Sequence, residues 1–132
     1  MRDGPEACVI AMEDEVIMSN KIVWYEVVGK DAGNLQTFYG KLFGWKFKEA
    51  PGMNYGMTDP EQTGIGGGVG SVPGGVTWAG FYVGVENVEE ALRQAEQLGA
   101  KVIKPVTRLP DVTFAVFADP EGNAIGLAEN AG

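Results

Sequence analysis

The sequence predicts an α+β domain built from two tandem βαβββ modules whose curved mixed sheets enclose a cleft. Three observations support this fold class. A strand followed by an amphipathic helix occurs twice, about 55 residues apart, and an Asp-Pro-Glu segment occurs once in each half. The chain has 132 residues, of which 45% are hydrophobic, enough for one compact soluble domain and too few for two.

The first module begins with a strand from Ile22 to Val28. A helix follows, and Gly44 ends it. A further strand opens at Lys46, and Asp59-Pro60-Glu61 is a turn. The helix is predicted from apolar residues that recur at the spacing of one buried face: Leu35, Phe38, Tyr39, Leu42 and Phe43.

The second module repeats this order. Its first strand runs from Trp78 to Val85, and its helix is capped by Asn87 and Glu90 and stopped by Gly99. Another strand opens at Lys101, and a turn follows at Asp119-Pro120-Glu121. The residues expected to form the buried stripe of the helix are Val88, Ala91, Leu92, Ala95 and Leu98.

The module boundaries are expected at about residues 21–72 and 76–130, joined by the Pro- and Gly-containing linker 71–75. Together they form one domain, residues 20–132. Residues 1–19 show no sustained period and are expected to be a flexible tail, with an extra strand from Ala7 to Met12 as the alternative. The single cysteine, Cys8, lies in this segment and cannot form an internal disulfide.

Composition excludes several classes of function. The sequence has no histidine, so catalytic triads, Cys-His pairs and His-based zinc or iron sites are absent. Ten basic against 18 acidic residues give a net charge of -8, which argues against nucleic acid and anionic membranes as partners. With no apolar run long enough to span a membrane and no signal-peptide pattern, we expect a cytoplasmic protein.

Strand alternation predicts which side chains face the cleft. In the first strand these are Ile22, Trp24, Glu26 and Val28. In the first strand of the second module they are Trp78, Gly80 and Tyr82.

Two motifs carry a resemblance to a known family. The sequence has Phe38-Tyr39 followed by Phe43-Gly44-Trp45, and later Asp119-Pro120-Glu121-Gly122-Asn123. At these positions in paired modules it resembles the vicinal oxygen chelate superfamily, which includes glyoxalases, bleomycin-resistance proteins and ring-cleaving dioxygenases. The resemblance extends from about Lys21 to Glu129. Both motifs also have a structural explanation, as helix-packing aromatics and as a tight turn.

Enzymes of that superfamily hold a divalent metal with side chains from four strands. The resemblance puts these positions on Trp24, near Gly80, on Gly126 and within the glycine-rich segment 65–69. None of these residues offers a metal-ligating side chain. The sequence is therefore expected to be a member without metal ligands, with no metal and no cofactor.

We expect such a member to bind an aromatic or partly apolar small molecule in the cleft, because small residues leave volume beside large aromatic ones: Gly80, Ala124, Gly126 and Ala128. The alternative is that the rings fill the cleft and close it. The predicted ligand-binding residues are Trp24, Glu26, Trp78, Tyr82, Phe114 and Gly126.

Catalytic residues are not defined by the sequence, although Glu26 is a weak candidate because a carboxyl group in an apolar setting has a raised pKa. A lyase or isomerase that works through Glu26 or an oxygen-only metal site is the alternative function, and whether the protein is an enzyme stays open. We also expect a homodimer.

Overall fold

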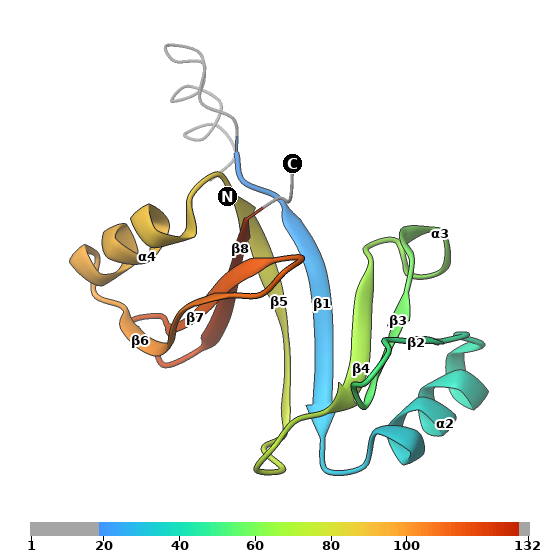
Figure 1. Cartoon of the computed structure of the whole chain (residues 1–132). Coiled ribbons are helices and arrows are strands. Elements are labelled where there is room, and N and C mark those ends of the chain that lie inside the picture. Colours follow the sequence, from blue (N-terminus) through green and yellow to red (C-terminus); the bar gives the residue numbers. More distant parts are fainter. Residues whose placement is uncertain (1–18, 130–132) are drawn as a thin grey trace.

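The computed structural model describes residues 19–129, which form one eight-stranded curved sheet with helices at its two ends (Figure 1). The predicted tail, residues 1–19, lies outside this range except for Ser19. The elements are β1 (Ile22–Gly29), α2 (Ala32–Phe43), β2 (Lys48–Glu49), β3 (Tyr55–Thr58), α3 (Pro60–Thr63), β4 (Gly67–Ser71), β5 (Trp78–Val85), α4 (Val88–Gln97), β6 (Lys101–Arg108), β7 (Thr113–Ala118) and β8 (Ala124–Glu129).

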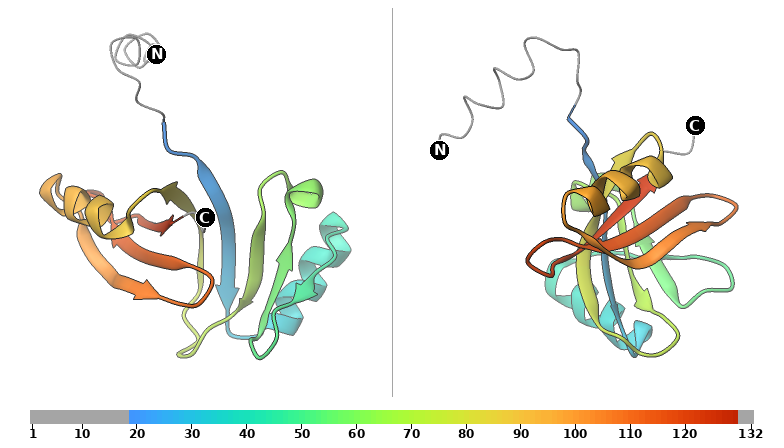
Figure 2. Two further views of the ribbon diagram at one scale, coloured as in Figure 1. Left: turned by 45° about the horizontal axis from the view of Figure 1, so that its top comes forward. Right: turned by 90° about the vertical axis from the view of Figure 1, so that its left-hand side faces the viewer.

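The strand order is β2-β3-β4-β1-β5-β8-β7-β6, which confirms the predicted α+β fold of two βαβββ modules. Each module pairs its first and last strands in parallel, β1 with β4 and β5 with β8. The other neighbours are antiparallel, and β1 joins the modules by pairing with β5. The sheets of the modules are therefore halves of one continuous curved sheet, with β1 and β5 at its centre (Figure 2).

The structure confirms Gly44 as the end of the first helix and Asn87 as the cap of the second, and it adds Asp31 as the cap of the first. Asp31 caps α2 by accepting a hydrogen bond from the Asn34 amide, and Gly44 ends this helix with a φ of 78°. Asn87 caps α4 by accepting from the Glu90 amide at 2.9 Å. Neither α2, α4 nor the short α3 is long and apolar enough to cross a membrane, in the part of the chain that the structure describes.

The second module has an aliphatic core beneath α4. Val88 is fully buried and Leu92 is 7% exposed. They pack with strand residues of β5, β7 and β8: Val85, Ala115 and Leu127. Leu98, predicted to belong to this stripe, is instead 80% exposed, because the helix ends there and the chain turns away into Gly99.

The first helix is packed differently, and here the predicted buried face is wrong. No residue of α2 is buried, and Phe38, Leu42 and Phe43 are each more than half exposed. The strands beyond β4 are only four and two residues long, so the sheet is too narrow to cover the whole apolar stripe. The aromatic residues pack on one another instead: the Tyr39 ring stacks on Phe43 and on Trp45.

The two Asp-Pro-Glu segments adopt different structures. Asp119 forms the predicted turn, its carboxylate accepting hydrogen bonds from the amides of Glu121 and Asn123. The Asn123 side-chain amide also donates to this carboxylate, and its bond, followed by those of the backbone amides, lowers the pKa of Asp119. In the first module Asp59 caps the single-turn helix α3, so this segment begins a helix rather than a simple turn.

A β-bulge changes one predicted side-chain orientation. The pairing of β1 with β5 is regular from Trp24 onward but shifts between Ile22 and Trp24. Ile22 is thereby aligned with Val83, which packs against the α4 core. Strict alternation, which placed Ile22 on the cleft face, does not extend across this bulge.

Candidate functional site

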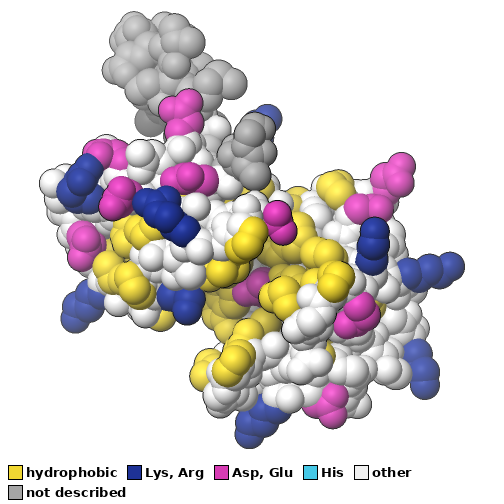
Figure 3. Space-filling model, in the orientation of Figure 1, with side chains coloured by type: hydrophobic (Ala, Val, Ile, Leu, Met, Phe, Trp, Pro, Cys, Tyr) yellow, Lys and Arg dark blue, Asp and Glu magenta, His cyan; other side chains and the backbone are white. Residues whose placement is uncertain are grey.

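The concave face of the sheet brings together the side chains of a candidate site from both modules. Trp24 on β1 pairs with Tyr82 on β5, which in turn pairs with Gly126 on β8. Two residues further along β1, Glu26 is paired with Gly80 on β5 and with Gly68 on β4. In the space-filling view, hydrophobic side chains gather in the hollow between the two halves of the molecule (Figure 3).

Glu26 is the centre of a hydrogen-bonded group on this face. The Tyr55 hydroxyl donates to Oε2 of Glu26 at 2.7 Å, and the Tyr82 hydroxyl donates to Oε1 at 3.2 Å. The indole Nε1 of Trp24 donates to the Tyr55 hydroxyl at 2.8 Å. A carboxyl group from the first strand is thus held by one tyrosine from each module.

The surroundings of this group change its acid–base properties. Burial raises the pKa of Glu26 above its ordinary value, and the hydrogen bonds from Tyr55 and Tyr82 partly offset this rise. Burial and the nearby Glu26 carboxylate raise the pKa values of both tyrosine hydroxyls. Both phenols therefore keep their protons at neutral pH and act as donors, while Glu26 is the group that can change protonation.

Aromatic rings form a wall from β5 to β7. Trp78 meets Tyr82 edge to face with ring centroids 5.7 Å apart, and Tyr82 meets Phe114 at 6.2 Å. The Lys104 amine lies 5.9 Å from the centre of the Phe114 ring. Trp78, Tyr82 and Phe114 are only partly buried, so the wall is accessible to solvent.

Aromatic rings occupy the space above the glycines of the concave face, so these glycines leave no empty volume there. A Cβ atom at Gly126 would lie 2.3 Å from the Tyr82 ring, and one at Gly80 would lie 2.6 Å from Trp78. A Cβ at Gly68 would lie 2.2 Å from Tyr55. The volume that the sequence predicts at Gly80 and Gly126 is therefore taken by aromatic side chains lying close to the backbone.

The donor groups on this face do not fit a divalent metal ion. Register places Tyr82, rather than Gly80, in one row with Trp24 and Gly126. In this row Trp24 offers only an indole N–H, and Tyr82 offers a phenol that already donates to Glu26. Gly126 has no side chain. A single carboxylate cannot supply the several oxygen or nitrogen ligands that such ions require. Within residues 19–129, no group of three or more Cys, Asp or Glu side chains is placed to hold a metal.

Sequence reasoning placed most of this group correctly but missed one member. Trp24, Glu26, Trp78 and Tyr82 lie on the concave face, as alternation predicts, Phe114 lies against Tyr82, and Gly126 lies beneath the Tyr82 ring. A ligand-binding role for these six residues stays a prediction.

The missed residue is Tyr55, which makes the shortest hydrogen bond to Glu26. Its position on β3 reaches the site only because β3 pairs with β4 and β4 with β1. Alternation on the short strand could have shown that Tyr55 and Met57 share a face. No local signal shows that this face is the one that contains Glu26.

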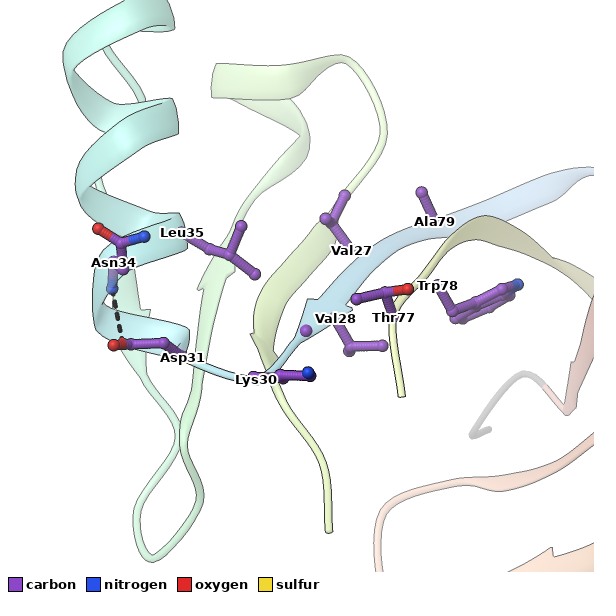
Figure 4. A pocket seen from close by; sticks show the side chains of 10 residues that line it. Val27, Val28, Lys30, Asp31, Asn34, Leu35, Thr77, Trp78 and Ala79 are labelled. Atoms are coloured by element: carbon purple, nitrogen blue, oxygen red, sulfur yellow. Dashed lines mark hydrogen bonds between the residues drawn. The ribbon is translucent and has the colours of Figure 1, made fainter. Parts of the chain in front are cut away.

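A second depression, of about 600 Å³, opens at the ends of β1 and β5 beside the start of α2 (Figure 4). Val27 and Ala79 lie on one side of the two strands, while Val28 and Trp78 lie on the other. The carboxylate of Asp31, on its rim, is engaged in capping α2. The depression contains neither Glu26 nor Tyr55, so the candidate site remains the concave face.

Comparisons with known proteins agree with this architecture. A search of curated proteins found no match. Among solved structures, the chain is similar to methylmalonyl-CoA epimerase from Mycobacterium tuberculosis, with a TM-score of 0.61, 12% identity, and coverage of 84% of this chain and 88% of that one. It is also similar to a structure described as an NAD-dependent benzaldehyde dehydrogenase from Legionella pneumophila, with a TM-score of 0.60, 18% identity, and coverage of 80% and 96%.

A third similar structure is a glyoxalase/bleomycin resistance protein/dioxygenase superfamily member from Vibrio splendidus 12B01, with a TM-score of 0.56, 16% identity, and coverage of 85% and 100%. At these identities the three likenesses establish the fold alone. The family model of the glyoxalase-like domain matches residues 26–128, which is most of the chain. The paired βαβββ modules and this match confirm the resemblance noted in the sequence, and the chain belongs to the glyoxalase-like domain family of the vicinal oxygen chelate superfamily.

Proposed function

We propose that this chain is a metal-free small-molecule-binding protein of the glyoxalase/bleomycin-resistance type, which takes an aromatic or partly apolar organic molecule on its concave face. The observation that carries this proposal is the pairing of an accessible aromatic wall with one hydrogen-bonded carboxyl group. Rings supply apolar area and stacking, while the carboxyl group orients a polar substituent.

Tryptophan fluorescence tests this proposal directly. Trp24 and Trp78 stand on the concave face, so a stacked ligand changes their emission. In a screen of aromatic and quinone-like compounds, a hit should lose about 1–3 kcal/mol of binding free energy in Trp24→Ala, the usual loss of an aromatic anchor. Trp45, in the α2 aromatic cluster, is the control position, and Trp45→Phe should leave binding unchanged. A screen without any hit would support closed aromatic packing instead.

A second candidate function rests on the Glu26 carboxyl group itself. Its pKa is raised by burial, and two tyrosine hydroxyls hold it in place. Such a group can take a proton from a bound molecule and return it, the step that a lyase or isomerase needs. Hydrogen–deuterium exchange at C–H groups of carbonyl compounds, followed by NMR, tests it: exchange should occur with the wild-type protein and cease in Glu26→Gln.

We further propose that the protein forms a homodimer in the cytoplasm. Support for the dimer comes from α2, where Phe38, Leu42 and Phe43 expose apolar surface that a second copy would cover. Sedimentation equilibrium should give twice the 14.0 kDa chain mass, and Leu42→Glu should shift the protein toward the monomer. A monomeric wild-type protein at micromolar concentration contradicts the dimer. Cell fractionation tests the location.

A further inference from the structure

The hydrogen bonds around Glu26 have a fixed direction. An indole N–H can only donate, so the Tyr55 oxygen accepts from Trp24 Nε1. The single hydroxyl hydrogen of Tyr55 is then free to donate to Oε2 of Glu26. Trp24 and Tyr55 thereby commit Oε2 to accepting a hydrogen bond from the protein and hold the carboxyl plane in place.

The other carboxylate oxygen is less fully used. Tyr82 donates to Oε1 at 3.2 Å, longer than the 2.7–2.8 Å typical of O–H···O bonds. A carboxylate oxygen accepts two hydrogen bonds, and Oε1 receives this one long bond among the described residues. Oε1 is therefore the atom of Glu26 that can accept from a ligand.

Glu26 also has no cationic partner in the described range. The ion pairs between residues 19 and 129 are those of Arg93 with Glu90 and of Arg108 with Glu89, both on the surface. The lysines aligned with the concave face, Lys48 and Lys104, lie on the outermost strands β2 and β6 and are exposed. A partly buried carboxylate of this kind gains most from a partner that brings a positive charge.

The rings around Glu26 favour the same kind of partner. The Lys104 ammonium over Phe114 shows that a ring on this face accepts a cation. Trp78 and Tyr82 stand on β5, the strand that pairs with β1, and the Tyr82 hydroxyl contacts the carboxylate itself. The net charge of -8 adds a general attraction for cations and repels anions.

We propose that the ligand is an organic ammonium ion, whose N–H group donates to Oε1 of Glu26 while its apolar body packs against the aromatic wall. This inference rests on the proposed small-molecule-binding function and narrows it to one ligand class. Tyr55 and Trp24 are positioning residues in this scheme, because they hold Oε2 and leave Oε1 to the ligand.

Three probes of similar size and different charge test the inference: 2-phenylethylammonium, 2-phenylethanol and phenylacetate. Binding is measured by NMR shift perturbation and tryptophan fluorescence at constant pH and ionic strength. We expect the ammonium probe to bind about 10-fold or more tightly than the alcohol, the advantage of one charge-assisted hydrogen bond, and phenylacetate to bind most weakly. Equal binding of ammonium and alcohol, or strongest binding of phenylacetate, overturns the inference while leaving the small-molecule function in place. Absence of binding by all three contradicts both.

Variants locate the contact. Glu26→Gln should bring the ammonium probe down to the affinity of the alcohol, with the alcohol changed by less than about threefold. Tyr82→Phe keeps the ring and removes the competing donor at Oε1, so the ammonium preference should persist. Loss of that preference in Tyr82→Phe, or its persistence in a folded Glu26→Gln protein, overturns the assignment to Oε1. Lys41→Gln, at an exposed position in the last turn of α2, is the matched control, which should leave the preference for the ammonium probe in place.

Discussion

The two modules share one topology but are stabilised by different means. The second module buries aliphatic side chains of α4 against β5, β7 and β8. The first module buries no residue of α2, and it packs tyrosine rings onto glycines of β4 and links polar groups across its strands. Tyr25, for example, lies over Gly67 and bonds the Thr58 hydroxyl at 2.8 Å, and Gln36 of α2 donates to the Val69 carbonyl.

This difference explains where the candidate site lies. Aliphatic burial beneath α4 gives the second module its own core, and this module contributes the aromatic wall and the Tyr82 hydroxyl to the site. The glycine-rich strand of the first module lets Tyr55 approach the sheet closely enough to hold Glu26. The site lies where the two kinds of packing meet, at the β1 and β5 junction.

Removing core volume gives the largest expected difference between the modules. Leu92→Ala should lower the free energy of unfolding by about 3 kcal/mol, and the melting temperature by roughly 10 °C, since it empties a buried position beneath β7 and β8. The matched change in the first helix is Leu42→Ala, at a position that is 59% exposed in the single chain, and at protein concentrations too low for dimerisation it should cost less than about 1 kcal/mol. Urea unfolding measures both. Similar losses in the two variants would mean that the α2 face is covered.

The ring-on-glycine packing of the first module is tested by adding one methyl group. Gly68→Ala should destabilise the protein by about 1–3 kcal/mol and displace Tyr55 from Glu26, because the new Cβ would stand 2.2 Å from the Tyr55 ring. Gly66→Ala is the control: its Cβ would meet nothing closer than 3.4 Å, so stability should stay within about 0.5 kcal/mol. Thermal unfolding and the NMR signals of Tyr55 report the two effects. An undisturbed Tyr55 in Gly68→Ala would show that this contact is not tight.

The Glu26 carboxyl group should make stability depend on pH. Because burial raises its pKa in the folded state, the folded protein holds more protons than the unfolded chain just above pH 4.5. Its contribution to stability therefore falls as pH rises from 4.5 through the folded-state pKa, and is constant above it. The groups that face it are Tyr55 and Tyr82, which stay protonated in this range.

Comparison with Glu26→Gln isolates this contribution. The stability of the wild-type protein relative to Glu26→Gln should decrease as pH rises from 4.5 to 7, as measured by urea unfolding at several pH values. Lys104→Gln serves as a control for general charge effects, and its difference from the wild-type protein should change little over this range. An opposite slope for Glu26→Gln would mean that the folded state favours the carboxylate.

The smallest expected effect separates the two tyrosines that hold Glu26. Each hydroxyl lowers the pKa of the carboxyl group, so Tyr55→Phe and Tyr82→Phe should both raise it further. Tyr55→Phe should have the larger effect, because its bond is 2.7 Å long and that of Tyr82 is 3.2 Å. A ¹³C NMR titration of the Glu26 carboxyl group measures both shifts. A larger pKa shift in Tyr82→Phe than in Tyr55→Phe would mean that Tyr82, from the second module, is the stronger hydrogen-bond donor to Glu26.

The sequence alone determined the elements and much of the site. Strand alternation put Trp24 and Glu26 on one face, Gly44 marked the end of the first helix, Asn87 marked the start of the second, and the repeated pattern predicted two modules. These features depend on residues close together in the chain, whose spacing directly reflects the 2-residue and 3.6-residue periods of strands and helices.

The tertiary structure decided the partners of those residues. Tyr55 reaches Glu26 through the register of β3, β4 and β1, and the Tyr82 ring covers Gly126 because β5 pairs with β8. The apolar stripe of α2 has the spacing of a buried face, yet the narrow edge of the sheet leaves Phe38 and Leu42 exposed. Periodicity reports that a side chain prefers burial, whereas the long-range pairing of strands determines how much surface is present to bury it.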